Sequence, residues 1–366
     1  MGGLDVEQKL SKTQLLWIVI SFNLGSAILL LPGILVNTAA QDAWIPLTLG
    51  AFLSLLVLLP ISKLSCLYPN LSFVQYSEKI MGKLLGKMIG VIWCWFAMHL
   101  GSLVVRNFTD FFNLTMLPNT PTLAISALLF IPIILALYQG IGSLGILAQA
   151  ISPFVLILFV GITFNMLPNM SSERILPLFE QDLMHITWGS IQALSFPFGE
   201  SILFASLLLF VKNKSGCSKV LIKGVLIAAA LLLLGLVRTL LALGVDETQR
   251  LYFAVLEPSR REAFGFVRGL EIFIIVNWFN FAFFKIAVCL YAFCQGVSNL
   301  INSDRYKPFI IPAVIIMISL SKLSYENIVQ EVNAAAVLWP VYAVPIEVLL
   351  PLSLLAVAMI RKAREN

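Results

Sequence analysis

The sequence predicts an all-α membrane protein with ten transmembrane helices, arranged as two five-helix repeats of inverted topology. Three observations predict this class. The composition is 59% hydrophobic and 12% charged, roughly half the charged fraction of a typical soluble domain. Apolar runs close to the ~20 residues that cross a bilayer recur along the whole chain. The first and sixth runs are both interrupted near their middle, as expected for discontinuous helices in an inverted repeat.

The expected spans follow the apolar runs in order. They are 13–38, 44–67, 88–116, 122–139, 143–167, 183–211, 219–244, 263–299, 308–323 and 335–360. We expect a single integral membrane domain over 1–366, with one repeat at about 13–167 and the other at about 183–360. Between the second and third spans, "SFVQYSEKIMGKLLGK" is charged and amphipathic. We expect that segment to lie along the membrane surface.

Lysine and arginine residues predict the orientation of the spans. Fifteen of them flank the expected spans on one side and five on the other. Because the cytoplasmic side carries the excess of positive charge, this asymmetry predicts that both termini lie in the cytoplasm. Orientation in the lipid bilayer also explains the net charge of +5. We therefore expect no nucleic acid partner.

The first interruption is "NLGSAILLLPG" and the second is "ALSFPFGESILF". Glycine weakens a helix, and proline both removes a backbone donor and clashes with the preceding turn. A half-helix that starts near Gly25 would present free N–H groups to a carboxylate. Carbonyls freed near Ser195 and Phe196 would suit an ammonium group, so an α-amino acid would fit both. The alternative is a pair of ordinary kinks without a ligand.

The interruptions and the spans expected beside them supply the candidate ligand-binding residues. These are Asn23, Leu24, Gly25, Ser26, Ala27, Phe96, Leu100, Ser195, Phe196, Pro197, Phe198, Phe281 and Lys285.

Ionisable residues at membrane depth are costly and point to function. Glu200 and Lys285 are expected to be each other's partner, or Lys285 is a cation that binds carbonyls freed by the first break, or it contacts the ligand. Arg106 and Asp110 are spaced to neutralise each other on one helix.

Other charges lie nearer the ends of their spans. We expect Arg238, Arg268 and Glu271 to form a network at the outer end, either a gate or contacts with lipid headgroups. Glu347 has no partner that the sequence identifies.

Enzymatic chemistry is not expected. The chain has only two histidines, and its five cysteines show no metal-ligand spacing. "GIGSLG" at 140–145 lacks the strand and helix context of a dinucleotide site and fits a turn between two membrane helices. We expect no cofactor and no metal.

Several of these motifs resemble those of the B subunits of bacterial spore germinant receptors. "LGSAILLLP" is similar to a motif that opens those subunits, and "SFPFGESILF" carries the glutamate that follows their sixth-span break. Arg106 and the spacing from Glu271 to Trp278 also match. The resemblance implies the LeuT-type fold of the amino acid–polyamine–organocation transporter superfamily. Pro197 and Lys285 depart from what we expect of the family.

That resemblance implies a receptor subunit in the inner membrane of the spore. The subunit would bind a small germinant, often an amino acid, and act with an A subunit and a lipoprotein C subunit. Arg106, Glu200, Glu271 and Lys285 would be its intramembrane charge or coupling residues. The alternative is an ion- or proton-coupled amino acid permease, because both functions need a pocket at the same midplane position. A scaffold without a ligand would not explain the two interruptions.

Overall fold

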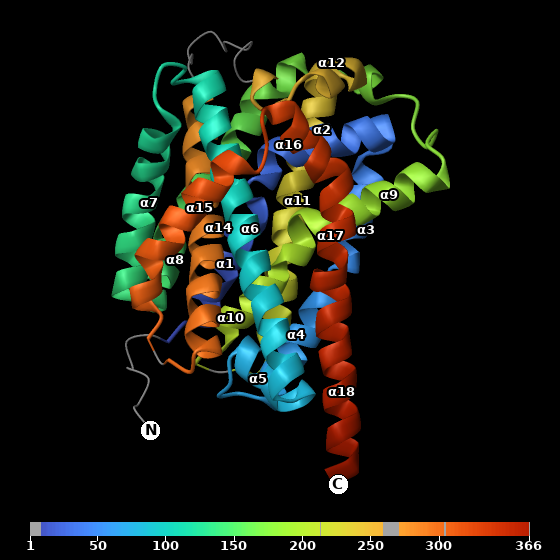
Figure 1. The fold of residues 1–366 in the computed structure, drawn as a ribbon. Coiled ribbons are helices and arrows are strands. Elements are labelled where there is room, and N and C mark those ends of the chain that lie inside the picture. The colour runs from blue at the N-terminus through green and yellow to red at the C-terminus, as the bar shows by residue number, and fades with distance from the viewer. Residues whose placement is uncertain (1–8, 213, 259–270, 304, 366) are drawn as a thin grey trace.

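The computed structural model describes residues 9–212, 214–258, 271–303 and 305–365, and within these ranges the chain is helical with no β-sheet. Figure 1 shows long helices running side by side between two ends of the molecule. One end carries α5 and the last turns of α18, and the other carries α12 and α16.

The helices follow the predicted spans. The elements of the first half are α1 (Lys12–Leu24), α2 (Ala27–Ala39), α3 (Trp44–Leu53), α4 (Leu55–Leu67), α5 (Phe73–Met81), α6 (Lys83–Thr115), α7 (Thr122–Gln139) and α8 (Ile141–Met166). The second half has α9 (Leu183–Ala193), η5 (Leu194–Phe198), η6 (Gly199–Phe204), α10 (Ala205–Leu208), α11 (Cys217–Leu243), α12 (Val245–Arg250), α14 (Glu271–Leu300) and α15 (Ile310–Leu323). The last span consists of α16 (Ile328–Asn333), η8 (Ala334–Leu338), α17 (Trp339–Val344), η9 (Pro345–Leu349) and α18 (Leu350–Glu365).

Within the described ranges, eight helices are long and apolar enough to cross a membrane, and the bent pair α1–α2 makes a ninth. The predicted ninth span, 308–323, corresponds to α15, which has 14 residues. Among the described span starts, two differ from the prediction by five residues or more. The third span begins at Lys83 rather than 88, and the last begins at Ile328 rather than 335. Residues 263–270 of the predicted eighth span lie outside the described part of the chain.

The amphipathic segment after α4 packs on protein through its apolar face, and its position relative to the membrane surface stays a prediction. Its second half forms the first turns of α6, and its first half is α5, whose apolar face packs on protein. Phe73 stacks on Trp93 with ring centroids 3.9 Å apart, and Tyr76 is fully buried. An amphipathic sequence pattern is the same whether the apolar face packs on lipid or on a neighbouring helix.

Both predicted interruptions are present. α1 ends at Leu24, and α2 continues after Gly25 and Ser26 with a bend of 47°. In the sixth span, Phe196 has φ −141° and ψ 105°, which is extended backbone between α9 and η6. Each break therefore falls where the sequence places its glycine or proline.

The broken helices lie inside the bundle rather than on its surface. The apolar window of the sixth span is 94% buried, against 33% for α8. α1 packs against α8, α11 and α14. Leu10, just before α1, pairs with Val211 after α10 through hydrogen bonds to Phe210 and Lys212. Because the broken helices are buried inside the bundle, the polar groups at the breaks face only protein or a cavity.

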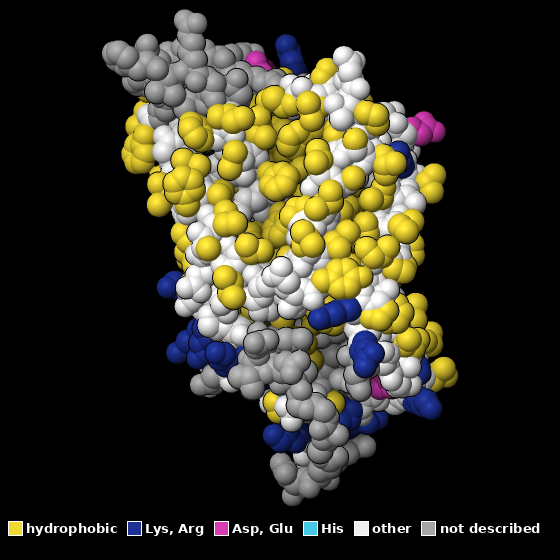
Figure 2. Space-filling view, turned by 90° about the vertical axis from the view of Figure 1, so that its left-hand side faces the viewer, with side chains coloured by type: hydrophobic (Ala, Val, Ile, Leu, Met, Phe, Trp, Pro, Cys, Tyr) yellow, Lys and Arg dark blue, Asp and Glu magenta, His cyan; other side chains and the backbone are white. Residues whose placement is uncertain are grey.

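One face of the molecule shows the charge asymmetry that the sequence predicts. Figure 2 shows a broad hydrophobic belt, with Lys and Arg side chains gathered toward the lower end. α5 and α18 meet at this end, where the Arg361 guanidinium donates to the Lys79 carbonyl.

Labelling of single cysteines tests the orientation. Of the native cysteines, Cys66 is exposed and the other four are buried, so a Cys66→Ser chain gives a low background. We expect Glu173→Cys to react with an impermeant maleimide added outside protoplasts, and Arg305→Cys to react only after permeabilisation, because Arg305 belongs to the basic side. The reverse pattern would contradict the orientation.

Candidate functional site

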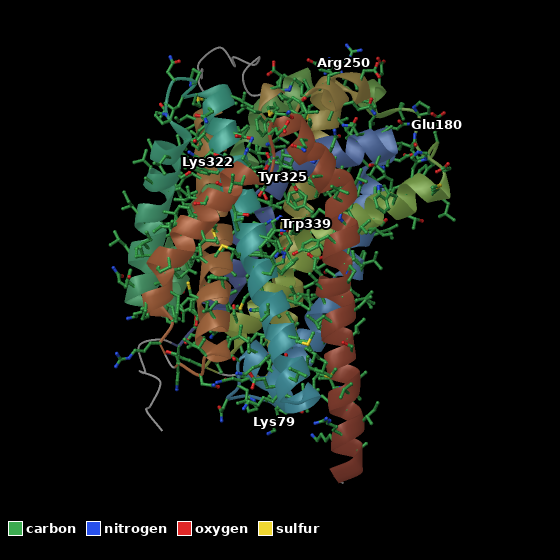
Figure 3. The ribbon with its side chains drawn as sticks, viewed as in Figure 1. Lys79, Glu180, Arg250, Lys322, Tyr325 and Trp339 are labelled. Carbon is green, nitrogen blue, oxygen red and sulfur yellow. The ribbon has the colours of Figure 1, made fainter. Side chains whose placement is uncertain are left out.

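A small cavity of about 30 Å³ lies where the two breaks approach each other. Its walls come from α2, α6, the sixth-span break and the segment from Tyr325 to Trp339, which Figure 3 labels at both ends. The lining residues are Ser26, Leu30, Leu100, Leu103, Val104, Asn107, Phe196, Glu200, Tyr325, Glu331, Ala335 and Trp339. The cavity therefore joins residues of both broken helices with the last span.

The wall is mostly apolar, with a few polar groups. Two carboxyl groups face it, those of Glu200 and Glu331, together with Ser26 and Asn107. No lysine, arginine or histidine is among its described lining residues. Burial raises the pKa of the Tyr325 phenol, and its hydroxyl group can donate a hydrogen bond.

Below the cavity, Lys285 of α14 pairs with Glu200. The Lys285 ammonium lies 2.5 Å from the Glu200 carboxylate, and both side chains are fully buried. The same ammonium lies 3.4 Å from the Ser26 hydroxyl and 5.0 Å from the centre of the Phe196 ring. Of the three roles considered from the sequence, the structure shows the ion pair with Glu200.

Gly25 makes room for this lysine. A Cβ atom at Gly25 would overlap the Lys285 stem and would lie 2.8 Å from the Phe22 carbonyl oxygen. The Gly25 N–H donates to the Ser21 carbonyl at 3.0 Å. The space beside Gly25, expected from the sequence to receive a ligand carboxylate, therefore holds the Lys285 side chain.

Glu347 of η9 completes the charged group at this level. Its side chain is fully buried and lies directly against Gly199, and neither carboxyl oxygen has a hydrogen-bond partner within the described residues. It interacts electrostatically with Glu200 and Lys285. The sequence identified no partner for Glu347, because this approach depends on how the last span crosses the sixth.

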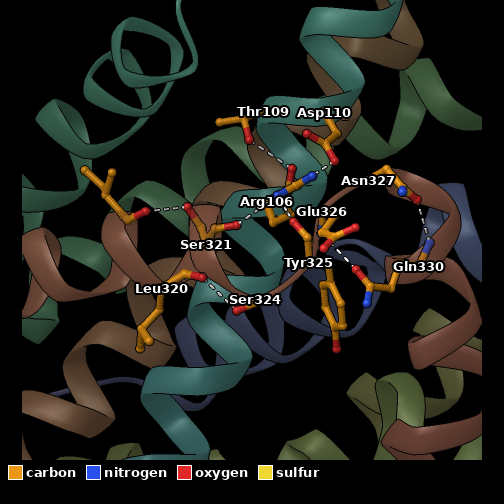
Figure 4. Close-up of polar contacts among 11 residues, drawn as sticks. Arg106, Thr109, Asp110, Leu320, Ser321, Ser324, Tyr325, Glu326, Asn327 and Gln330 are labelled. Atoms are coloured by element: carbon orange, nitrogen blue, oxygen red, sulfur yellow. Dashed lines mark hydrogen bonds and ion pairs between the residues drawn. The ribbon is translucent and has the colours of Figure 1, made fainter.

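A second charged group closes the other end of the cavity. Arg106 donates to Asp110 at 2.6 Å and to the Tyr325 carbonyl at 2.8 Å, as Figure 4 shows. The ion pair that its spacing predicted is therefore present. Glu331 lies close enough to interact electrostatically with both Asp110 and Arg106.

The Ser195 carbonyl, expected to be free for an ammonium group, accepts a hydrogen bond from the Trp339 indole at 3.0 Å. Asn23 is also occupied within the protein. Its amide donates to the Val19 carbonyl, and its oxygen accepts from the Ser201 hydroxyl.

The predicted residues divide into two sets. Those that line the cavity are Ser26, Leu100, Phe196 and Glu200. Those that are buried elsewhere in the described structure are Asn23, Leu24, Gly25, Ala27, Phe96, Ser195, Pro197, Phe198, Phe281 and Lys285. Phe96 lies behind the wall, where it stacks on Trp339 at 5.7 Å. The Glu271 side chain and Arg268 lie outside what the structure describes, and Arg238 is buried beside Thr163 and the Phe159 ring.

Sequence reasoning did not name eight of the twelve lining residues as site residues. Leu103, Val104 and Asn107 continue the α6 face of Leu100 at helical spacing, which was a usable signal. Glu331 was assigned to a loop, because its span was predicted to begin at 335.

The model of the family described as "Spore germination protein" matches residues 9–329. The chain belongs to this family. It is 24% identical to spore germination protein KB of Bacillus subtilis (strain 168) over 363 residues, covering 98% of this chain and 96% of that protein. It is 26% identical to spore germination protein YndE of the same organism, over 80% of this chain and 81% of that protein.

Solved transporter structures share the fold. MhsT in complex with L-phenylalanine matches with a TM-score of 0.69 at 14% identity, over 96% of this chain and 99% of that chain. A Na⁺-coupled sialic acid symporter matches with 0.68 at 13%, over 92% and 77%. MHP1, a nucleobase-cation-symport-1 family transporter, matches with 0.65 at 13%, over 90% and 75%. These similarities identify a LeuT-type membrane fold, as the two breaks predicted.

Removing one partner of the Lys285–Glu200 pair should destabilise the protein more than removing both. A buried pair that loses one member costs about 3–5 kcal/mol, because the other charge is stranded. We expect the unfolding temperature in lipid nanodiscs to fall strongly for Lys285→Met and for Glu200→Gln, and to recover partly in the double variant. Additive losses in the double variant would show that the two side chains are not coupled.

Gly25→Ala tests the close approach of Lys285. The added methyl group has to displace the lysine stem, so we expect a lower unfolding temperature. Gly161→Ala on α8 is the matched control, since nothing lies within 4 Å of its added Cβ and alanine favours helix by up to about 1 kcal/mol. Equal effects of the two changes would contradict the packing described.

Proposed function

We propose that this chain is the ligand-sensing subunit of a spore germinant receptor. It binds a small germinant, with an amino acid as the expected class, in the cavity between the two broken helices. The observation that carries the proposal is the convergence of Ser26, from the first break, and Phe196, from the second, on one cavity wall. Membership of the spore germination family supports the biological setting.

Ligands bound to structural neighbours support a small-molecule role for this fold. MhsT was solved with L-phenylalanine, and MHP1 with bromovinylhydantoin. In this chain the cavity holds about two water molecules by volume, since one needs ~10–15 Å³. Ligand pockets usually measure ~300 Å³ or more. Binding therefore requires the lining side chains to move apart, and a receptor that changes shape on binding can report its ligand.

The proposed setting follows from the same features. The subunit would lie in the inner membrane of the spore, with its basic end and both termini in the cytoplasm. It would act with an A subunit and a lipoprotein C subunit. The lipid bilayer would cover the hydrophobic belt of Figure 2.

An ion- or proton-coupled amino acid permease is the second candidate. The buried carboxyl groups of Glu200, Glu347 and Glu331 favour it, since intramembrane acids commonly serve as coupling sites. Lys285 argues against sodium coupling, because its ammonium already supplies a positive charge beside the first break. A receptor without sodium coupling would respond equally in sodium and potassium buffers.

Filling the cavity tests the proposed function. Spores whose only receptor contains this chain would be challenged with each amino acid in turn, and germination followed by the fall in optical density. We expect Leu100→Trp to raise the germinant concentration for half-maximal response at least tenfold, because the larger ring occupies the cavity. Ala335→Leu fills the cavity from another wall and should act in the same direction.

Leu128→Trp is the control, because Leu128 is 64% exposed on α7 and faces away from the cavity. Membrane abundance of each variant would be measured by immunoblot. Normal responses in both filled variants at normal abundance would contradict the proposed site. Uptake of the labelled germinant into vesicles that contain this chain alone would favour the permease.

A further inference from the structure

We propose that the cavity recognises a positively charged amine on its ligand, and that Glu331 is the residue that binds it. This inference rests on the proposed function, since it names the chemical class of ligand for the same cavity. Glu331 is 3% exposed and lines the cavity. Neither of its carboxyl oxygens accepts a hydrogen bond from a basic or amide group of the described residues, and the side chain nearest in electrostatic terms is a second acid, Asp110.

The charged residues near Glu331 do not neutralise its carboxyl group. Arg106 is the basic residue that interacts with it, and Arg106 already binds Asp110 and the carbonyls of Ser321 and Tyr325. The group of Arg106, Asp110 and Glu331 therefore has one more acid than base. A buried carboxylate without a partner is costly, and an ammonium group entering the cavity would supply the missing positive charge.

The Glu200 carboxyl group also lines the cavity, but Lys285 pairs with it at 2.5 Å. The Ser26 hydroxyl lies near this pair, 3.4 Å from the Lys285 ammonium. Of the two lining carboxyl groups, Glu331 is therefore the one that the described residues leave without a salt bridge.

The remaining wall favours an organic amine over a metal ion. Hard cations such as calcium take six to eight oxygen ligands, whereas most of this wall is made of leucine, valine, alanine and aromatic side chains. An ammonium group needs only a few acceptors, which Glu331 and Asn107 supply. The rings of Trp339 and Phe196 also line the cavity, and aromatic faces attract organic cations.

Three probes of equal length but different charge test the inference. The full chain in lipid nanodiscs would be titrated at neutral pH with n-propylamine, n-propanol and propionate, and its unfolding temperature measured. We expect stabilisation by propylamine and much less by propanol or propionate. Glu331→Gln, which keeps the size and removes the charge, should weaken the propylamine effect at least tenfold in concentration.

Glu326→Gln is the matched control, because Glu326 lies five residues away in the same segment and is exposed. It should respond like the unmodified chain. Glu331→Asp keeps the carboxyl group on a shorter side chain and should retain part of the amine selectivity. This variant tests the inference even if Glu331→Gln folds poorly. Equal stabilisation by all three probes, or a Glu331→Gln chain that responds normally, would overturn the inference.

Other outcomes separate this inference from the proposed function. If all three probes stabilise the chain equally while Leu100→Trp still impairs germination, the amine inference is wrong and the receptor function stands. A proton shared between Glu331 and Asp110 would then explain how the buried Glu331 is neutralised. If propylamine binds through Glu331 but the filled-cavity variants germinate normally, the amine site stands and the receptor function falls.

Discussion

The buried ion pair between Lys285 and Glu200 is the interaction on which the centre of the molecule depends. A helix broken inside a membrane leaves backbone groups and side-chain dipoles that lipid cannot satisfy. Lys285 crosses from α14 to the first break, contacts Ser26, and ends on the glutamate that follows the second break. One side chain thus links three helices at the level where two of them lose their regular hydrogen bonds.

This arrangement divides the charged residues into two groups with the cavity between them. Lys285, Glu200 and Glu347 lie on one side, and Arg106, Asp110 and Glu331 on the other. Each group contains one base and two acids. The low dielectric of the interior makes such an imbalance expensive, so the cavity is electrostatically suited to a positive group even though most of its wall is apolar.

The sequence predicted the helical spans and both breaks, because glycine and proline act on the backbone of their own helix. It also predicted the pair of Arg106 and Asp110, which depends only on one helical turn. The partner of Lys285 stayed among three possibilities, because that choice depends on how distant helices pack. Glu331 was missed for a similar reason: it lies on α16, ahead of the predicted start of the last span, and its burial depends on how that helix packs over the cavity, which local hydropathy does not encode.

The bond from the Trp339 indole to the Ser195 carbonyl has a mechanical consequence. Trp339 forms part of the cavity wall, and it belongs to a span that continues through α18 to the basic end of the molecule. That span contains two π-helical turns, at η8 and η9, on either side of Trp339, and such turns are often sites of functional adjustment. The cavity wall at Trp339 and the backbone of the sixth-span break are therefore joined by one hydrogen bond, so a displacement of Trp339 would either break that bond or move Ser195 with it.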